Sequence, residues 1–194
     1  MMKTLVINGS PRKNGHAMTL VNEMIKYLNG EVRIIHTYHD NISPCMDCRY
    51  CWNHSECCTD DGMQEVYKLL HEVDNIILAS PIYFSELTGQ LLNFASRLQL
   101  FYVSRCIRKN KEFKLKEKKG VLVLSAGGDT KNLERATESA NIIFRHTNTK
   151  LIGSTYTLRT NDISAEEDAL ALSKAHKLAL KLNDLHGYNL LINP

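Results

Sequence analysis

The stretch TLVINGSPRKNGHAM, from Thr4 to Met18, decides the fold class. It opens with a short apolar run of the kind that forms a buried β-strand, and a turn bracketed by Gly9 and Gly15 follows at once. Apolar residues then recur at helical intervals from about His16 to Leu28. A strand, a glycine-bracketed turn and a helix in this order are typical of the first unit of a parallel α/β sheet.

The same alternation continues along the rest of the chain. Short, continuously apolar runs predict buried strands, and apolar residues spaced by three or four predict helices. A capping box of Ser164 and Glu167 predicts the start of the last helix. The apolar stripe of that helix is Leu170, Ala175, Leu178, Leu182 and Leu185. The predicted strands are 4–8, 31–36, 75–79 (closed by Ser80-Pro81), 120–125 and 150–158, and the other predicted helices are 16–28, 62–70, 87–102 and 133–144.

Five apolar strands separated by helices predict a parallel sheet that is covered on both faces. The expected fold is therefore α/β, a flavodoxin-like doubly wound five-stranded parallel sheet in a three-layer α/β/α sandwich. We expect residues 1–194 to form a single domain with a cysteine-rich loop at about 40–61. In such a sheet, ligands bind outside the carboxyl ends of the strands, where the strand order reverses.

Composition excludes several classes of function. The net charge of +3 is small and the basic residues are scattered, so nucleic acid is not the expected partner. The basic segment from Arg105 to Lys119 is interpreted as a solvated linker, with a docking patch as the alternative. No apolar run is long enough to cross a bilayer, and the Met-Met-Lys start does not resemble a signal peptide, so we expect a cytoplasmic protein. In that reducing compartment, the six cysteines indicate metal or redox chemistry.

The turn after the first strand has the features of a phosphate-binding loop. Backbone N–H groups of such a turn point at the start of the helix, where the helix dipole favours an anion. Ser10 offers a hydroxyl, and Arg12 and Lys13 offer positive charge. His16-Ala17 stands where a Walker A loop needs Lys-Ser or Lys-Thr, and the Gly-x-Gly-x-x-Gly fingerprint is also absent. A plain solvated turn is the alternative interpretation.

Asn8 to Gly15 resembles the phosphate loop of the NADPH-dependent FMN reductase branch of flavodoxin-like proteins. The resemblance implies that the serine, the basic residues and the helix start hold the FMN phosphate. That family usually has hydroxyl-bearing side chains where this chain has His16-Ala17, so backbone amides and His16 are expected to replace one contact. The residues expected at this end of FMN are Ser10, Arg12, Lys13, Asn14, Gly15, His16, Ala17 and Met18.

Two further loops follow the third and fourth predicted strands. Adjacent aromatics at Tyr83-Phe84 offer an apolar surface to a flat ring, although core packing is the alternative. The second signature of the same family is similar to a set of residues in this region, namely Ser80 to Phe84, Gly89-Gln90-Leu91, Phe94 and Arg97. The resemblance implies that backbone N–H groups lie near the flavin ring. Glycines in the fourth-strand loop would let backbone approach the ring edge, a simple turn being the alternative. The residues expected at the ring are Pro81, Ile82, Tyr83, Phe84, Ser85, Ser125, Ala126, Gly127 and Gly128.

Five cysteines lie in the short segment from Cys45 to Cys58. A Cys-x2-Cys-x2-Cys spacing suits an Fe–S cluster, because short loops let three thiolates converge. Cys57 follows as the fourth candidate, and Cys58 duplicates that position. Zinc and a set of reduced, unliganded thiols are the alternatives. Cys106 is interpreted as a packing or incidental thiol.

The cysteine string resembles the compact motif of iron–sulfur flavoproteins, and Asp60-Asp61-Gly62-Met63 matches a segment of that group. The resemblance implies a [4Fe–4S] cluster beside FMN. Its expected ligands are Cys45, Cys48, Cys51 and Cys57.

These features predict an FMN-dependent oxidoreductase that takes electrons from NAD(P)H or a ferredoxin-like donor. A small-molecule acceptor is expected, such as a quinone, a nitro compound or dioxygen. No side chain stands out as a catalytic acid or base, so the chemistry is assigned to FMN. The resemblance implies a homodimer or homotetramer. The alternatives are a non-catalytic flavin/iron–sulfur electron carrier or redox-sensing module, and a zinc-stabilised scaffold.

Overall fold

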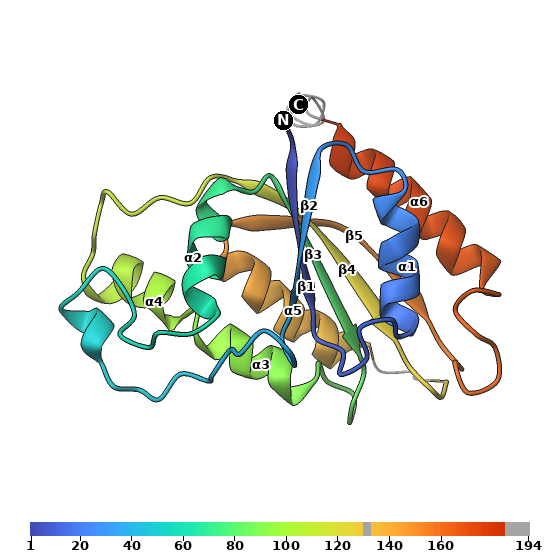
Figure 1. Cartoon of the computed structure of the whole chain (residues 1–194), viewed down its shortest axis with the longest axis horizontal. Helices are drawn as coiled ribbons and strands as arrows, with labels where there is room; N and C mark the ends of the chain where they lie inside the picture. The colour runs from blue at the N-terminus through green and yellow to red at the C-terminus, as the bar shows by residue number, and fades with distance from the viewer. Residues whose placement is uncertain (130–132, 185–194) are drawn as a thin grey trace, which may run out of the picture.

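The computed structural model describes residues 1–129 and 133–184. A five-stranded parallel sheet in the order β2-β1-β3-β4-β5 runs through its centre (Figure 1). This is the flavodoxin-like doubly wound sheet that the sequence predicts, so the expected fold class is confirmed. The strands are β1 (Lys3–Asn8), β2 (Glu31–His36), β3 (Asn75–Pro81), β4 (Lys118–Ser125) and β5 (Thr149–Thr157).

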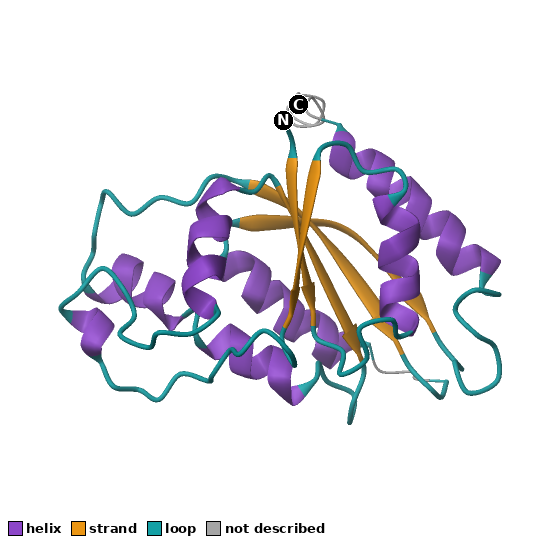
Figure 2. Cartoon of the chain, viewed as in Figure 1, coloured by secondary structure: helices purple, strands orange, loops and turns teal. Residues whose placement is uncertain are grey.

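Helices cover both faces of the sheet (Figure 2). One face carries α1 (His16–Ile25) and α6 (Ala169–Asn183), and the other carries α2 (Met63–Glu72), α3 (Gly89–Ser96) and α5 (Glu134–His146). The cysteine-rich loop extends to one side, where the short elements η1 (Tyr50–Trp52), α4 (Gln99–Tyr102) and the π-helical turn η2 (Val103–Ile107) lie. No helix in the described parts of the chain has the length and apolar character needed to cross a membrane.

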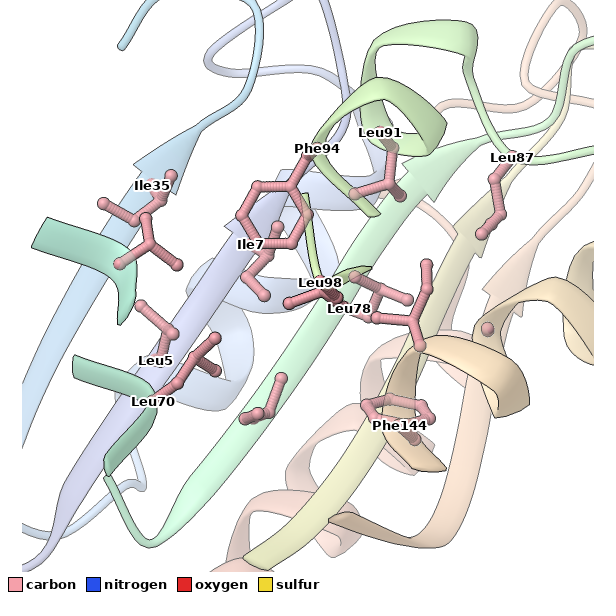
Figure 3. Packing of buried hydrophobic residues seen from close by; sticks show 14 of the residues in the cluster. Leu5, Ile7, Ile35, Leu70, Leu78, Leu87, Leu91, Phe94, Leu98 and Phe144 are labelled. Carbon is pink, nitrogen blue, oxygen red and sulfur yellow. The ribbon is translucent and has the colours of Figure 1, made fainter. Parts of the chain in front are cut away.

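Strand periodicity explains the two cores. Leu5 and Ile7 of β1 point to the side of α2, α3 and α5, and Val6 points to the side of α1 and α6. The strands β3 and β4 repeat this division, so each of the three central strands is apolar at consecutive positions. Figure 3 shows the larger core, in which Phe94 and Leu91 of α3 pack over Ile7 and Leu78. Each such buried side chain stabilises the fold by about 1.5–3 kcal/mol.

Several element boundaries differ from the prediction. Ser80 and Pro81 continue β3 instead of closing it, because their neighbours on β4 remain paired to them. The single helix predicted over 87–102 is divided between α3 and α4. Its hydrogen bonds tighten at the junction, where the N–H of Arg97 and of Leu98 each bond a carbonyl three residues back. The basic segment expected as a linker begins inside η2 and reaches into β4.

The start of the last helix also differs. Ser164 and Glu167 do form a hydrogen bond, with Oγ to Oε2 at 3.2 Å, but it stabilises a turn that precedes the helix. Asp168 is the N-cap of α6, and its side chain accepts a hydrogen bond from Ala171 N at 3.0 Å. Leu170 of the predicted apolar stripe is 81% exposed, and Leu185 lies outside the described residues.

The contrast between Leu78 and Leu170 gives a test of this core. Leu78→Ala should lower the free energy of unfolding by about 2–5 kcal/mol, because it removes a fully buried side chain and leaves a cavity. Leu170→Ala is the matched control and should change it by less than about 0.5 kcal/mol. Urea unfolding of both variants measures the difference, and equal losses would contradict the described core.

Candidate functional site

A cavity of about 340 Å³ opens at the carboxyl ends of β1, β3 and β4. It lies where the strand order reverses between β1 and β3, the usual ligand position in an open α/β sheet. Its volume is within the range of small-molecule and cofactor sites. The lining residues are Ser10, Arg12, Gly15, His16, Pro81, Ile82, Tyr83, Ser125, Ala126, Gly127, Thr160 and Asn161.

The loop after β1 presents hydrogen-bond donors to this cavity. The Ser10 N–H donates to Asn8 Oδ1 at 3.0 Å, and Ser10 Oγ accepts from the Arg12 N–H at 3.1 Å. The hydroxyl proton of Ser10 therefore stays available to a ligand. Gly15 is the N-cap of α1, makes no side-chain capping bond, and is followed by a first turn without an acidic residue. The first N–H groups of α1 and its dipole are thus directed at the cavity side, as an anion requires.

Charge at the cavity has one sign. Arg12 contributes a guanidinium, and none of the described lining residues is acidic. His16 also lines the cavity, and its Nδ1 lies 3.5 Å from Ala165 N in the segment that follows β5. This contact joins the start of α1 to the far side of the site.

The loop after β3 forms a tight turn at the rim. Tyr83 and Glu86 exchange two backbone hydrogen bonds at 2.9 and 3.0 Å, and Ile82 N donates to Ser125 O at 2.8 Å. Phe84 and Ser85 occupy the turn with φ of 52° and 64°, in the left-handed region that bulky residues seldom adopt. Phe84 is 99% exposed and does not line the cavity, so only Tyr83 of the aromatic pair does.

The loop after β4 closes the third side. Gly127 approaches Asn161 so closely that a Cβ on it would lie 2.9 Å from the amide side chain. Thr160 Oγ1 donates to Ala126 O, and Asn161 N donates to Gly127 O. Thr160 and Asn161 were not predicted as site residues. They follow the end of β5, the next strand along the sheet, and extending the strand-end rule to that loop would have included them.

The structure brings most of the predicted cofactor residues to one cavity and leaves others outside its lining. Ala17 and Met18 lie in the first turn of α1, and their side chains are buried in the smaller core. The predicted residues that do not line the cavity are Lys13, Asn14, Ala17, Met18, Phe84, Ser85 and Gly128.

A second, smaller pocket of about 60 Å³ lies in the cysteine-rich loop. All five cysteines of the motif line it, together with Tyr67 and Arg97, whereas Cys106 does not. Cys48 Sγ and Cys58 Sγ are 3.5 Å apart. In the described part of the chain, no three His, Cys, Asp or Glu side chains are grouped to hold one metal ion. A [4Fe–4S] cluster needs four thiolates, and the five cysteines that line this pocket fit that requirement in number and chemical type.

A buried ion pair holds this loop against the core. Arg97 is 2% exposed, and its Nη1 donates to Asp61 Oδ2 at 2.6 Å and to Ser43 O at 3.0 Å. Asp61 also accepts the N–H groups of Ser43 and Met63. Burial alone would raise the pKa of Asp61, but the Arg97 contact and these two backbone bonds hold the pKa below its ordinary value.

The loop is also closed by its own backbone. Gly62 N donates to Asn41 O at 3.0 Å, so the two ends of the segment lie side by side. A Cβ on Gly62 would come within 2.0 Å of Asp40 O, and this close approach requires glycine. We call this closure, formed by Asn41, Ser43, Asp61 and Gly62, the neck of the loop.

The cysteines differ in their surroundings. Burial raises the pKa of Cys51, and neighbouring cysteine thiolates add to the shift. Burial also acts to raise the pKa of Cys57, but hydrogen bonds from Thr59 and Arg97 outweigh it and lower the pKa overall. Cys57 is therefore the thiol most readily ionised by its environment among those with a shifted pKa.

Helix α3 connects the two pockets. At its start, Thr88 Oγ1 donates to Gly9 O in the loop after β1 at 2.6 Å. At its end, Ser96 Oγ accepts the N–H of Cys45 at 2.9 Å, and Arg97 follows directly. The helix is about 12 Å long at 1.5 Å per residue, so one short rigid element positions both sites.

The chain matches the sequence profile described as NADPH-dependent FMN reductase over residues 2–162. The match includes all three strand-end loops of the cavity and the whole cysteine segment. The chain belongs to the NADPH-dependent FMN reductase family.

Curated relatives of this FMN reductase family member carry the name iron–sulfur flavoprotein. One from Methanosarcina thermophila is 26% identical over 95% of each chain, and one from Methanocaldococcus jannaschii is 31% identical over 90% of this chain and 84% of its own. A third, from Archaeoglobus fulgidus, is 37% identical, but the match spans 50% of this chain and about half (46%) of the relative's length.

Solved structures show the same fold at low sequence identity. An FMN-dependent NADH-azoreductase from Bacillus anthracis in complex with FMN has a TM-score of 0.65 and 13% identity, covering 95% of this chain and 100% of its own. An NAD(P)H:quinone oxidoreductase from Methanothermobacter marburgensis has a TM-score of 0.66 and 13% identity, covering 95% and 98%. At this identity the comparison concerns the fold.

The Arg97–Asp61 pair predicts a pH-dependent effect on stability. Asp61→Asn should lower the free energy of unfolding near neutral pH by about 3–5 kcal/mol, because it leaves the Arg97 charge buried without a partner. The folded pKa of Asp61 is depressed, so its contribution is present above the ordinary carboxyl pKa of about 3.9 and is lost as pH falls through the folded value. The difference between variant and wild type should therefore shrink in acid.

Asp162→Asn is the control, since that carboxylate pairs with Arg159 on the surface. It should change stability by about 0–1 kcal/mol. Urea titrations over a pH series measure both variants, and a loss for Asp61→Asn that is independent of pH would contradict the role of the charge.

Proposed function

We propose that this protein binds FMN in the cavity at the strand ends and is an NAD(P)H- or ferredoxin-dependent oxidoreductase. We further propose that it holds a [4Fe–4S] cluster at Cys45, Cys48, Cys51 and Cys57. The expected acceptor is a small molecule such as a quinone, a nitro compound or dioxygen. We also propose that the chain forms a single domain, that it assembles as a homodimer or homotetramer, and that it is located in the cytoplasm.

One observation carries the flavin proposal. Ser10, Tyr83 and Gly127 come from three different strand-end loops and line the same cavity. Had the three loops diverged, the sequence motifs would have had no common ligand. The family assignment and the FMN complex of the related azoreductase fold support the choice of FMN.

The residues divide the task of binding between two ends of the cavity. The Ser10 hydroxyl, the Arg12 guanidinium and the N-terminus of α1 suit a dianionic phosphate. Ile82, Tyr83 and the backbone at Ala126-Gly127 suit a planar ring with a polar edge. When bound, FMN supplies hydride and single-electron transfer, and a [4Fe–4S] cluster supplies single-electron transfer. The chain's own residues then orient the cofactor and provide fixed dipoles around it.

The names of the curated relatives support the cluster proposal, and so do the number and type of the cysteine donors. The five thiols line one pocket, and the proposed four ligands all belong to it. The azoreductase and the quinone oxidoreductase with the same fold suggest acceptor classes but leave the acceptor of this protein open.

The function is tested on protein purified without air. Its visible spectrum should show flavin bands together with a broad iron–sulfur absorbance, and NAD(P)H should bleach the flavin bands. Bleaching only by a reduced ferredoxin would exclude NAD(P)H as the donor and would favour the electron-carrier alternative. A colourless protein with no affinity for added FMN would refute the proposal.

A phosphate-specific variant tests the placement of FMN. Ser10→Ala should weaken FMN binding by about 10- to 100-fold, because a hydrogen bond to a charged group contributes about 1.5–3 kcal/mol. Riboflavin lacks the phosphate, so its affinity should be almost unchanged. Ser154→Ala, in the middle of β5, is the control. Flavin fluorescence quenching measures each affinity, and an equal loss for both flavins would place the phosphate elsewhere.

A further inference from the structure

Arg97 stands out among the buried groups of the cysteine pocket. Its Nη1 donates to Asp61 and to the Ser43 carbonyl, whereas its Nη2 donates to Cys57 Sγ at 3.4 Å. Its Nε is buried and makes no hydrogen bond within the described structure. A guanidinium has donors fixed in one plane, so the Asp61 contact determines where the remaining N–H groups point. Of these groups, the one on Nη2 points at the sulfur of Cys57.

The two candidate fourth ligands are not equivalent. Cys57 is half-buried, packs against the main core and accepts the Arg97 hydrogen bond. Its carbonyl also accepts from Gln64 Nε2 at 2.9 Å, which fixes the backbone at this position. Cys58 is exposed, and its sulfur contacts that of Cys48.

The positions of Cys48 and Cys58 conflict with ligation by both residues. Two cysteine sulfurs bound to different irons of a cubane are separated by both iron–sulfur bonds and an iron–iron edge. Cys48 Sγ and Cys58 Sγ, at 3.5 Å, are too close for both to be ligands as placed. Cys48 belongs to the regular Cys-x2-Cys-x2-Cys spacing, so Cys58 is the thiol left over.

We infer that Arg97 is a positioning residue that selects Cys57 as the fourth cluster ligand and raises the reduction potential of the cluster through its hydrogen bond to Cys57 Sγ. This inference rests on the cluster in the proposed function. A donor directed at a ligand sulfur withdraws electron density from it and stabilises the more negative, reduced state. Because the guanidinium charge is paired with Asp61, the effect acts through the directed N–H group.

The ligand choice is tested with two serine variants of adjacent cysteines. Wild type, Cys57→Ser and Cys58→Ser are purified without air, and iron is measured relative to bound FMN. Cys58→Ser should keep the iron content of wild type, whereas Cys57→Ser should lose most of it. Loss of iron in Cys58→Ser with retention in Cys57→Ser would overturn the assignment.

The effect of Arg97 on the reduction potential is tested with Arg97→Lys. Lysine keeps the positive charge that pairs with Asp61, but it lacks the planar guanidinium that also reaches the Cys57 sulfur. Redox titration followed by the iron–sulfur absorbance should give a more negative midpoint potential than wild type, with the flavin potential unchanged. Iron affinity should fall by about 10-fold or more. Arg108→Lys is the matched control, because Arg108 also has a buried unpaired Nε but bonds Ser104 Oγ instead of a cysteine.

The results separate this inference from the function on which it rests. If wild-type protein contains iron and the midpoint potential of the cluster is the same in Arg97→Lys, the role of Arg97 is refuted and the proposed function is not. Wild-type protein that binds FMN but no iron would refute the cluster and this inference together, and leave the flavin site standing. If Arg97→Lys does not fold, the two serine variants still decide the ligand, because each replaces a cysteine that is not fully buried by a serine of similar shape.

Discussion

The burial of three central strands on both faces is the constraint from which the rest of the structure follows. Leu5, Val6 and Ile7 of β1 alternate between two separate cores, and β3 and β4 do the same in register. A shift of one residue in any of these strands would exchange the two core faces. The carboxyl ends of the strands are therefore held at one edge, and the loops that follow them meet there. The cavity is a consequence of the packing of the sheet.

The cysteine pocket depends on a different kind of constraint. Its loop supplies Ile42 to the larger core, with Cys51 and Cys57 packed against that core. Its position also relies on polar contacts made by Arg97, Asp61 and α3. A buried ion pair is costly to desolvate, and removing one partner leaves an uncompensated charge. Here Arg97, directly after α3, bonds both Ser43 and Asp61, one from each end of the loop. Because α3 also carries the Thr88 contact to Gly9, the geometry of the two pockets is set by the same helix.

The sequence was sufficient for the fold and for most of the cavity. Continuous apolar runs identify β1, β3 and β4, and glycine-containing turns behind them identify the loops that carry Ser10 and Gly127. Thr160 and Asn161 were not predicted as lining residues, because their loop carries no glycine or familiar motif. The exposure of Phe84 was not predicted for another reason, since its left-handed backbone conformation depends on the turn formed with its neighbours. The Arg97–Asp61 pair joins residues 36 apart in the chain, and a local sequence pattern does not predict such a contact.

The neck gives the cysteine loop a further property. Asn41 and Gly62 are hydrogen-bonded across the base of the loop, so the chain leaves β2 and enters α2 at neighbouring points. The span between them adds only a slowly growing closure entropy, whatever its length or composition. A flavodoxin-like scaffold can thus acquire, shorten or lose an entire cysteine module by insertion or deletion at one place, while the strands and the flavin cavity keep their register.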